Sequence, residues 1–270
     1  MHGLLRATGL LYRDAIRATG RSLAKSWIIV LAVVLFAGLM VLAATVAAPW
    51  GWLGGFVLGA VNALLIGATL SLIEHAVRST GVMPRDVLSS IGRYFWDVIG
   101  VGFVLWVPVM LLEKATEANP NGAFITAAVF LLLFILLNPA PEVIYLVRHD
   151  SALDVLRESY EFVLENWIEW FLPLAIVLAP LGLSLFFTIS GRLGRGAGLD
   201  FFQMLILPFT VLSAWLDYLG APRGVSPVLV LVLTPLLAVA MLIFRGHLFA
   251  ALHGSSRRQR LFRARFGNTD

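Results

Sequence analysis

The sequence has no cysteine and few charged residues. Without cysteine there can be no disulfide, no thiolate metal ligand and no cysteine nucleophile. Charged residues make up 13% of the 270 residues, whereas a soluble domain carries about 25%. So small a share cannot cover a globular surface with water-binding groups, which argues against a soluble domain.

The sequence also lacks the motifs that identify common catalytic and cofactor sites. It has no phosphate-binding glycine loop, no zinc helix with paired histidines and no Gly-x-Ser-x-Gly turn that would hold a nucleophile. The sequence therefore indicates no catalytic residue, no metal and no cofactor. It favours a non-enzymatic protein but leaves an enzyme open.

Hydrophobic residues, by contrast, are abundant and gather in long runs. They make up 59% of the chain, and six runs come close to the ~20 residues that a helix needs to cross a bilayer. These runs are Trp27–Val46, Trp52–Ile73, Phe95–Leu112, Ala123–Val147, Trp167–Ile189 and Val228–Leu252. We therefore expect an all-α polytopic membrane protein with about six transmembrane helices, forming a single transmembrane domain over residues 1–270.

The basic residues predict the orientation of these helices. With both termini in the cytoplasm, only four of the 20 basic residues lie outside: Lys114, Arg192, Arg195 and Arg223. This bias fits the positive-inside rule. A seventh run, residues 201–216, is broken by Pro208, and if it crossed the membrane the arginine-rich tail would move outside. We therefore place it as an outer-face, interfacial or re-entrant helix.

The chain also contains a weak internal repeat. Asp14, Asp86 and Asp154 begin matching stretches that recur after roughly seventy residues, a period typical of repeated structural units. Each unit would contain an amphipathic cytoplasmic helix followed by a membrane hairpin. We expect three units, at about residues 10–80, 81–149 and 150–254, and then a basic cytoplasmic tail at 255–270.

Two of the predicted connector helices carry charge along one face. Basic residues recur at intervals of four up to Arg21 and Lys25, and acidic residues recur at three or four up to Glu161 and Glu165. The simplest interpretation is two interfacial helices with solvated charges. The two stripes could instead pair across the cytoplasmic side. A third interpretation is that the basic helix and tail bind anionic lipid headgroups. Nucleic-acid binding is not indicated, because the basic residues adjoin apolar spans.

A group of ionisable residues lies within or near the spans, where charge is costly and often functional. The predicted topology brings them to the cytoplasmic end of the bundle: Glu74, His75, Glu142, Arg245 and His247. Pro139 and Pro141 precede Glu142, so we expect a broken helix there that frees backbone carbonyls. Such a site can hold an ion or substrate. We favour a structural Glu142–Arg245 pair. The histidines could serve in a proton relay or bind a metal, but ordinary interface histidines are the commoner case.

One segment carries a resemblance to a known family. Leu156-Arg-Glu-Ser-Tyr160, leading to Glu165-Asn-Trp167 and the next span, resembles the six-span membrane domain attached to some glycerophosphodiester phosphodiesterases and that of related bacterial membrane proteins. The resemblance implies a fold and a place in the bacterial inner membrane. It implies no catalytic residue, because that family's catalytic domain is absent.

Three functions remain open from the sequence. The favoured one is a non-enzymatic scaffold or accessory subunit that contacts lipid and a membrane protein partner. The alternative is a small transporter or permease with a path near Glu142. The second alternative is an intramembrane enzyme that acts on lipid. A transporter predicts a water-filled cavity at Glu142, an enzyme predicts polar groups converging on one cleft, and a scaffold predicts a packed interior.

Overall fold

The chain folds into a bundle of helices. The computed structural model describes residues 2–78, 81–149, 151–182, 201–222, 224 and 226–254, and all regular structure in these residues is helical. The basic tail at 255–270 lies outside the described residues. The elements are α1 (His2–Lys25), α2 (Ile28–Ala47), η1 (Ala48–Trp50), α3 (Trp52–Arg78), α4 (Pro84–Ser90), α5 (Phe95–Thr116), α6 (Gly122–Leu136), α7 (Ala140–Leu146), α8 (Ala152–Leu178), η2 (Ala179–Leu181), α10 (Phe201–Tyr218) and α11 (Ser226–His253).

Six helical segments among the described residues are long and apolar enough to cross a membrane. They are Ile28–Trp50, Trp52–Arg78, Phe95–Thr116, Phe124–Leu146, Ala152–Leu181 and Ser226–His253. A helix is the structure that satisfies every backbone donor and acceptor where no water is available. The chain is therefore an all-α multi-pass membrane protein, which confirms the predicted fold and number of spans.

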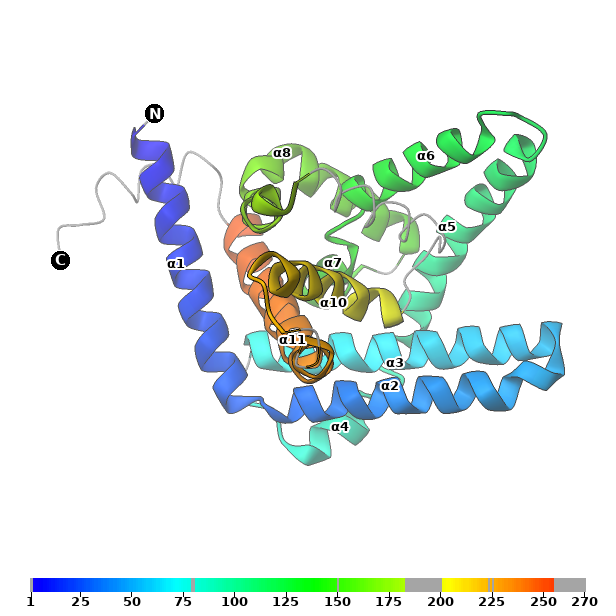
Figure 1. Cartoon of the computed structure of the whole chain (residues 1–270), viewed down its shortest axis with the longest axis horizontal. Coiled ribbons are helices and arrows are strands. Elements are labelled where there is room, and N and C mark those ends of the chain that lie inside the picture. The colour runs from blue at the N-terminus through cyan, green and yellow to red at the C-terminus, as the bar shows by residue number, and fades with distance from the viewer. Residues whose placement is uncertain are drawn as a thin grey trace.

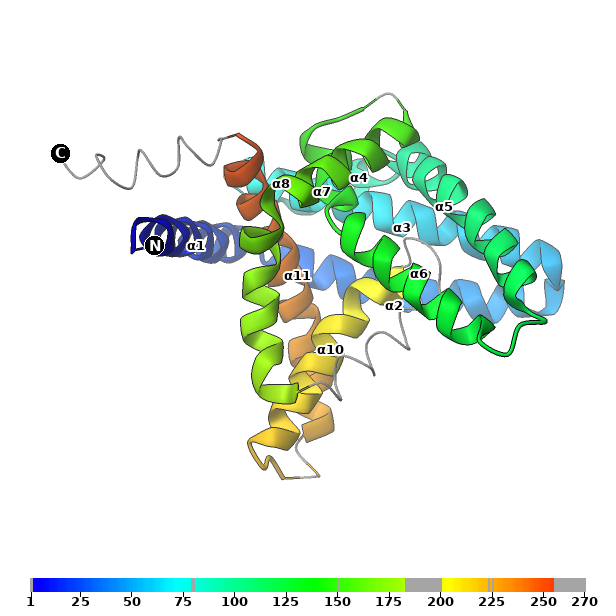
Figure 2. The same cartoon turned by 90° about the horizontal axis from the view of Figure 1, so that it is seen from above.

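The first two spans form a long hairpin (Figure 1). Its turn contains Gly51 with a φ of 55°, a left-handed conformation that glycine adopts without strain. A Cβ at Gly54 would overlap the carbonyl oxygen of Ala47 across the hairpin. The α5–α6 hairpin uses the same device, because a Cβ at Gly122 would overlap the carbonyl of Thr116. Both hairpins point their turns to the same side of the molecule (Figures 1 and 2).

The fourth span is broken, as the prolines predict. Helix α6 ends at Leu136 and α7 begins at Ala140, with a turn at residues 137–139 between them. Pro139 and Pro141 lack the backbone N–H groups that would continue the helical ladder. The short helix α7 therefore stands as a separate element at one end of the span.

The predicted third connector and the fifth span are joined in one helix. The expected connector and the expected span from Trp167 form one helix, α8, which starts at Ala152. The backbone leaves helical geometry at Asn166, with φ −126° and ψ 18°, so the helix bends where the span was predicted to begin. The expected boundary is therefore a bend and not a loop. Beyond residue 182 the predicted span lies outside the described residues.

Helix α10 starts inside the bundle and runs outward. The backbone N–H of Phe201 donates to Asn62 Oδ1 at 2.8 Å, and the Phe201 ring lies 6.5 Å from that of Phe36. Both partners lie near the middle of the α2–α3 hairpin, whereas Tyr218 at the other end is exposed. With 18 residues α10 is shorter than the six spans. This geometry is closer to the re-entrant than to the interfacial expectation.

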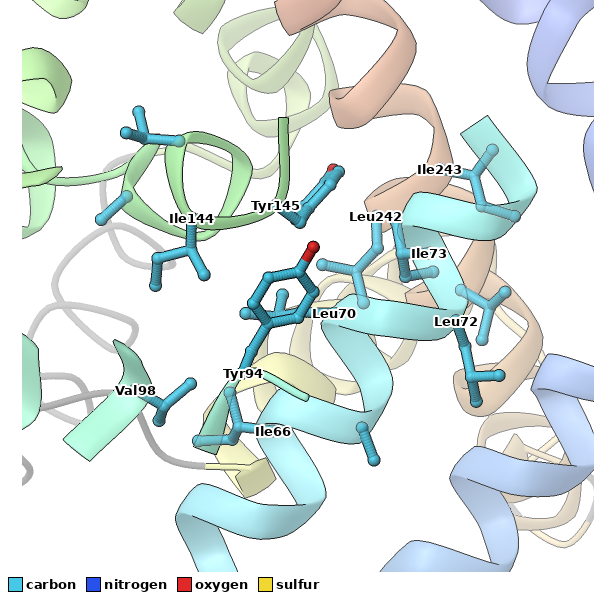
Figure 3. Packing of buried hydrophobic residues seen from close by; sticks show 14 of the residues in the cluster. Ile66, Leu70, Leu72, Ile73, Tyr94, Val98, Ile144, Tyr145, Leu242 and Ile243 are labelled. Carbon is cyan, nitrogen blue, oxygen red and sulfur yellow. The ribbon is translucent and has the colours of Figure 1, made fainter. Parts of the chain in front are cut away.

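Helix α11 holds the bundle together. It packs against α1, α2, α3, α7, α8 and α10, and it crosses the α2–α3 hairpin (Figures 1 and 2). Its contacts with α3 and α7 form part of the apolar core. Figure 3 shows Leu70 and Ile73 of α3 beside Leu242 of α11, with Tyr94 and Tyr145 between the elements. This core surrounds the polar site described next.

Candidate functional site

Two carboxylates are buried near α7: Glu142 at its beginning, and Glu74 of α3 beside its end. The Glu142 side chain is 0% exposed and that of Glu74 is 4% exposed. Removing a carboxylate from water costs several kcal/mol unless a partner of opposite charge and further hydrogen bonds replace the water. The partners of these two groups therefore decide what the site can do.

Glu142 is paired with Arg245 of α11. Arg245 Nε donates to Oε1 and Nη2 donates to Oε2, both at 2.8 Å. The same Nη2 donates to the carbonyl oxygen of Asn138 at 2.6 Å, in the turn that the prolines create. The expected structural pair and the expected freed carbonyl are both present. A two-pronged contact of this kind fixes the guanidinium in position as well as neutralising it.

The Trp170 ring also contacts the Arg245 guanidinium. The Arg245 guanidinium carbon lies 5.2 Å from the centre of the Trp170 ring, a distance at which the ring face attracts a cation. Trp170 Nε1 donates to Asn138 Oδ1 at 2.9 Å. Helices α8 and α11 and the α6–α7 turn therefore meet at one arginine.

Glu74 is paired with several arginines at once. It lies 2.8 Å from Arg148 Nη2, 3.2 Å from Arg93 Nη2 and 3.4 Å from Arg78 Nε. Tyr94 Oη donates to Glu74 Oε2 at 2.7 Å. The three arginine side chains are 36% to 54% exposed, so this carboxylate is buried beneath cations that still contact solvent.

The contact with Glu74 shifts the pKa values of neighbouring groups outside the spans. Burial, followed by the hydrogen bond to Glu74, raises the pKa of Tyr94 to about 12. The hydrogen bond to Glu74 also raises the pKa of Arg148. Arg148 has a φ of 61°, which is uncommon for a residue with a side chain. Its ion pair with Glu74 accompanies this strained backbone.

Helix α7 links the two carboxylates. Arg78 Nη2 donates to the carbonyl oxygens of Tyr145 and Leu146, at 3.1 and 2.7 Å, and so caps the C-terminal end of α7. Tyr145 is 1% exposed, and its hydroxyl has no partner among the described residues. A Cβ at Gly246 would lie 2.6 Å from that hydroxyl, so glycine leaves room for the ring. Figure 3 shows the Tyr94 ring directed toward Tyr145.

The two histidines make hydrogen bonds to other groups. His247 Nε2 lies 3.0 Å from Ser22 Oγ of α1, and His75 Nδ1 lies 2.8 Å from the carbonyl oxygen of Ser71. Successive helical residues are turned by about 100°, so His247 faces away from Arg245, two positions earlier. In the part of the chain that the structure describes, no three His, Asp or Glu side chains gather as a metal site would require.

The predicted charge stripes are not joined by an ion pair among the described residues. Glu161 pairs with Arg157 one turn away, at 2.8 Å, while Arg21, Lys25 and Glu165 are exposed. Helix α1 reaches α8 by another contact, in which Tyr12 Oη donates to the Glu169 carbonyl at 2.7 Å. Burial raises the pKa of Tyr12 to about 12. The arrangement fits solvated stripes better than direct pairing.

The sequence did not identify several residues of the site: Tyr94, Arg93, Arg148, Asn138 and Trp170. Asn138 could have been found, because it precedes the prolines whose effect was expected. The arginines beside Glu74 were assigned only to the cytoplasmic side. No periodicity connects Tyr94 or Trp170 to its polar partner.

Comparison with known proteins gives no relative for this site. No family model, curated protein or solved structure matches the chain. The resemblance to the membrane domain of glycerophosphodiester phosphodiesterases stays a prediction from the sequence. The functional argument therefore rests on the geometry above.

Proposed function

We propose that this chain is a non-enzymatic accessory subunit or scaffold of the membrane. The observation that supports it is the pairing of both buried carboxylates. Both oxygens of Glu142 accept from Arg245, and both oxygens of Glu74 accept from Arg148 or Tyr94. A carboxylate that carries an ion or a proton must exchange partners, and these two are held by short charge-assisted contacts. We assign them a structural role: Glu142 joins α7 to α11, and Glu74 joins α3 to Tyr94 and Arg148.

The same geometry gives little support to the alternatives. A transport path near Glu142 requires water at a side chain that is 0% exposed. An intramembrane enzyme requires two or more polar groups at one lipid-accessible cleft. His75 and His247 bond to other partners, and Glu74 lies beneath its arginines. The accessory role needs only the buried, paired state in which the structure holds Glu74 and Glu142.

The proposed location is the bacterial inner membrane with both termini in the cytoplasm. Support comes from the basic residues, because Arg78, Arg93 and Arg148 gather at one end of the bundle around Glu74, as the positive-inside rule expects of a cytoplasmic face. The cysteine-free chain allows a direct test. A single cysteine introduced by Asn119→Cys should react with an impermeant thiol reagent outside intact cells, and one introduced by Arg85→Cys should not. The reverse pattern would invert the topology.

We also propose the three repeated units that the spacing of Asp14, Asp86 and Asp154 predicts. Helix α1 precedes the α2–α3 hairpin and α4 precedes α5, α6 and α7. The third unit departs from this plan, since its connector is continuous with its span in α8 and it contains α10. Anionic headgroups remain the proposed ligands of the exposed basic face of α1.

The accessory role can be tested against transport in proteoliposomes. Vesicles that contain the purified chain should dissipate an imposed proton gradient no faster than empty vesicles, as followed with an internal pH dye. The Glu142→Gln variant serves as the control. A leak above that of empty vesicles, abolished by Glu142→Gln, would replace the accessory role with a transporter.

Photo-crosslinking in native membranes tests the partner itself. Photo-reactive residues would replace three exposed side chains on different spans, Phe56, Phe103 and Leu231, which are 73%, 62% and 73% exposed. A subunit of a complex should give a discrete protein adduct from at least one position and lipid adducts from the others. Lipid adducts alone from all three positions would argue against a stable partner.

A further inference from the structure

An apolar cavity of about 430 Å³ lies between α6, α8, α10 and α11. Its walls include Leu174 of α8, Leu212 of α10 and Met241 of α11, and one end is formed by Asn138 and Arg245. The volume falls within the ~300–1,000 Å³ of pockets that hold small ligands. The cavity therefore combines a long apolar wall with a small polar end.

The residues at that polar end carry hydrogen-bond donors that are not used within the described residues. Arg245 uses Nε and Nη2 for Glu142 and Asn138, and the two N–H groups of Nη1 have no acceptor within the described residues. Trp170 can only donate, so its bond to Asn138 identifies Oδ1 and leaves Nδ2 as the free amide nitrogen. Nδ2 also has no acceptor in the described part of the chain. A ligand with an acceptor oxygen would complete the hydrogen bonds of both groups.

The charge balance favours a neutral acceptor. Glu142 already neutralises Arg245 through two short contacts. A ligand carboxylate would place a second negative charge beside one guanidinium where little water is present, which is costly. The carbonyl oxygen of an ester accepts from both donors without adding charge.

The position of Arg245 along α11 suits the ester region of a bilayer. It stands eight residues before His253 at the end of the helix, a rise of about 12 Å at 1.5 Å per residue. The interfacial layer that covers each side of the hydrocarbon core is roughly 5–8 Å thick. A helix that ends near the membrane surface thus holds Arg245 just below the layer where acyl chains join their headgroups.

We propose that this cavity binds one acyl chain of a membrane glycerolipid. The ester carbonyl accepts from Arg245 Nη1 and Asn138 Nδ2, and the chain lies along the walls of α8, α10 and α11. The site does not depend on the proposed accessory role, because the purified chain would bind the lipid without any partner protein.

Photolabelling with a defined lipid tests the site. The purified full chain, in nanodiscs of phosphatidylglycerol, would receive phosphatidylglycerol with a diazirine in one acyl chain, and crosslinked peptides would be mapped by mass spectrometry. Adducts should form on cavity-lining residues of α8 and α10. Leu212→Trp fills the cavity and should reduce these adducts roughly tenfold. The matched control Leu231→Trp, on the exposed face of α11, should leave them unchanged.

A second variant and a second probe complete the photolabelling experiment. Val211→Phe is a milder filling of the same wall and replaces Leu212→Trp if that variant does not fold. Labelling that neither change reduces, or that occurs only on outward-facing residues, would overturn the proposal. A diazirine fatty acid should label the cavity less than the ester lipid does. Stronger labelling by the free acid would overturn the choice of an ester.

Discussion

Glu74 and Glu142 are both buried carboxylates, but the protein stabilises them in opposite ways. Glu142 has one arginine, which comes from another helix and makes two short bonds. Glu74 has three arginines and a tyrosine, and each arginine keeps part of its surface in solvent. The first arrangement is specific and depends on a single side chain. The second is shared among several side chains, so we expect it to tolerate the loss of one of them.

The difference follows from position. Glu142 lies between α7 and α11, and all of its surface is covered by protein. Glu74 lies one turn from the end of α3, within reach of arginines from α3 itself, the α4–α5 turn and the segment after α7. A carboxylate that is fully buried needs protein groups to satisfy its whole charge, whereas near the end of a helix water can hydrate its partners. The two sites should therefore respond differently to mutation.

The largest effect is expected from Arg245→Met. The change leaves the Glu142 carboxylate buried without a counter-charge, which should lower the free energy of unfolding by about 3–5 kcal/mol. Unfolding of the purified protein in mixed micelles would measure it. The double variant Glu142→Gln with Arg245→Met should recover most of the loss, since it removes the uncompensated charge. A double variant as unstable as the single one would show that the pair is not the source of the effect.

Glu74→Gln should have a smaller effect. The three arginines it leaves behind are partly exposed and can be hydrated, so the loss should be about 1–3 kcal/mol, mainly from the contacts with Tyr94 and Arg148. Exposed Glu165→Gln serves as a control and should change little. If Glu74→Gln destabilises the protein as much as Arg245→Met does, the contrast between a shared and a single partner is wrong.

The smallest effect is a pH dependence at Tyr94. Its pKa is about 12 in the folded chain and 10.0 for an ordinary tyrosine, because burial and Glu74 oppose the phenolate. The unfolded chain loses this proton first, so the stabilisation is complete below pH 10 and is lost as the pH rises toward 12. Tyr94→Phe should make the fall in stability over that range shallower. Tyr12 has the same raised pKa, so Tyr12→Phe is the matched comparison. An unchanged slope in Tyr94→Phe would contradict the assignment.

Much of the fold could be predicted from the sequence, because the need for apolar spans is visible in local composition. The helix break before Glu142 followed from the lack of N–H groups in Pro139 and Pro141, and Arg245 was the expected partner. The site around Glu74 could not be predicted. Arg148 reaches it through a backbone conformation with positive φ at the end of α7, which the sequence pattern does not reveal. The cavity beside α10 likewise depends on where that helix begins, which hydrophobicity does not specify.

Helix α1 has its main partner at the far end of the chain. Ser22 and His247 are in contact although 225 residues separate them. At ~5–20 residues per second, the ribosome needs roughly ten to forty-five seconds to make the residues between them. During that interval the apolar side of α1 lacks its contact with α11, and α3 and the membrane surface are available to cover it. Assembly of this bundle is therefore complete only after α11 has been made, and a defect in α11 removes the main partner of α1.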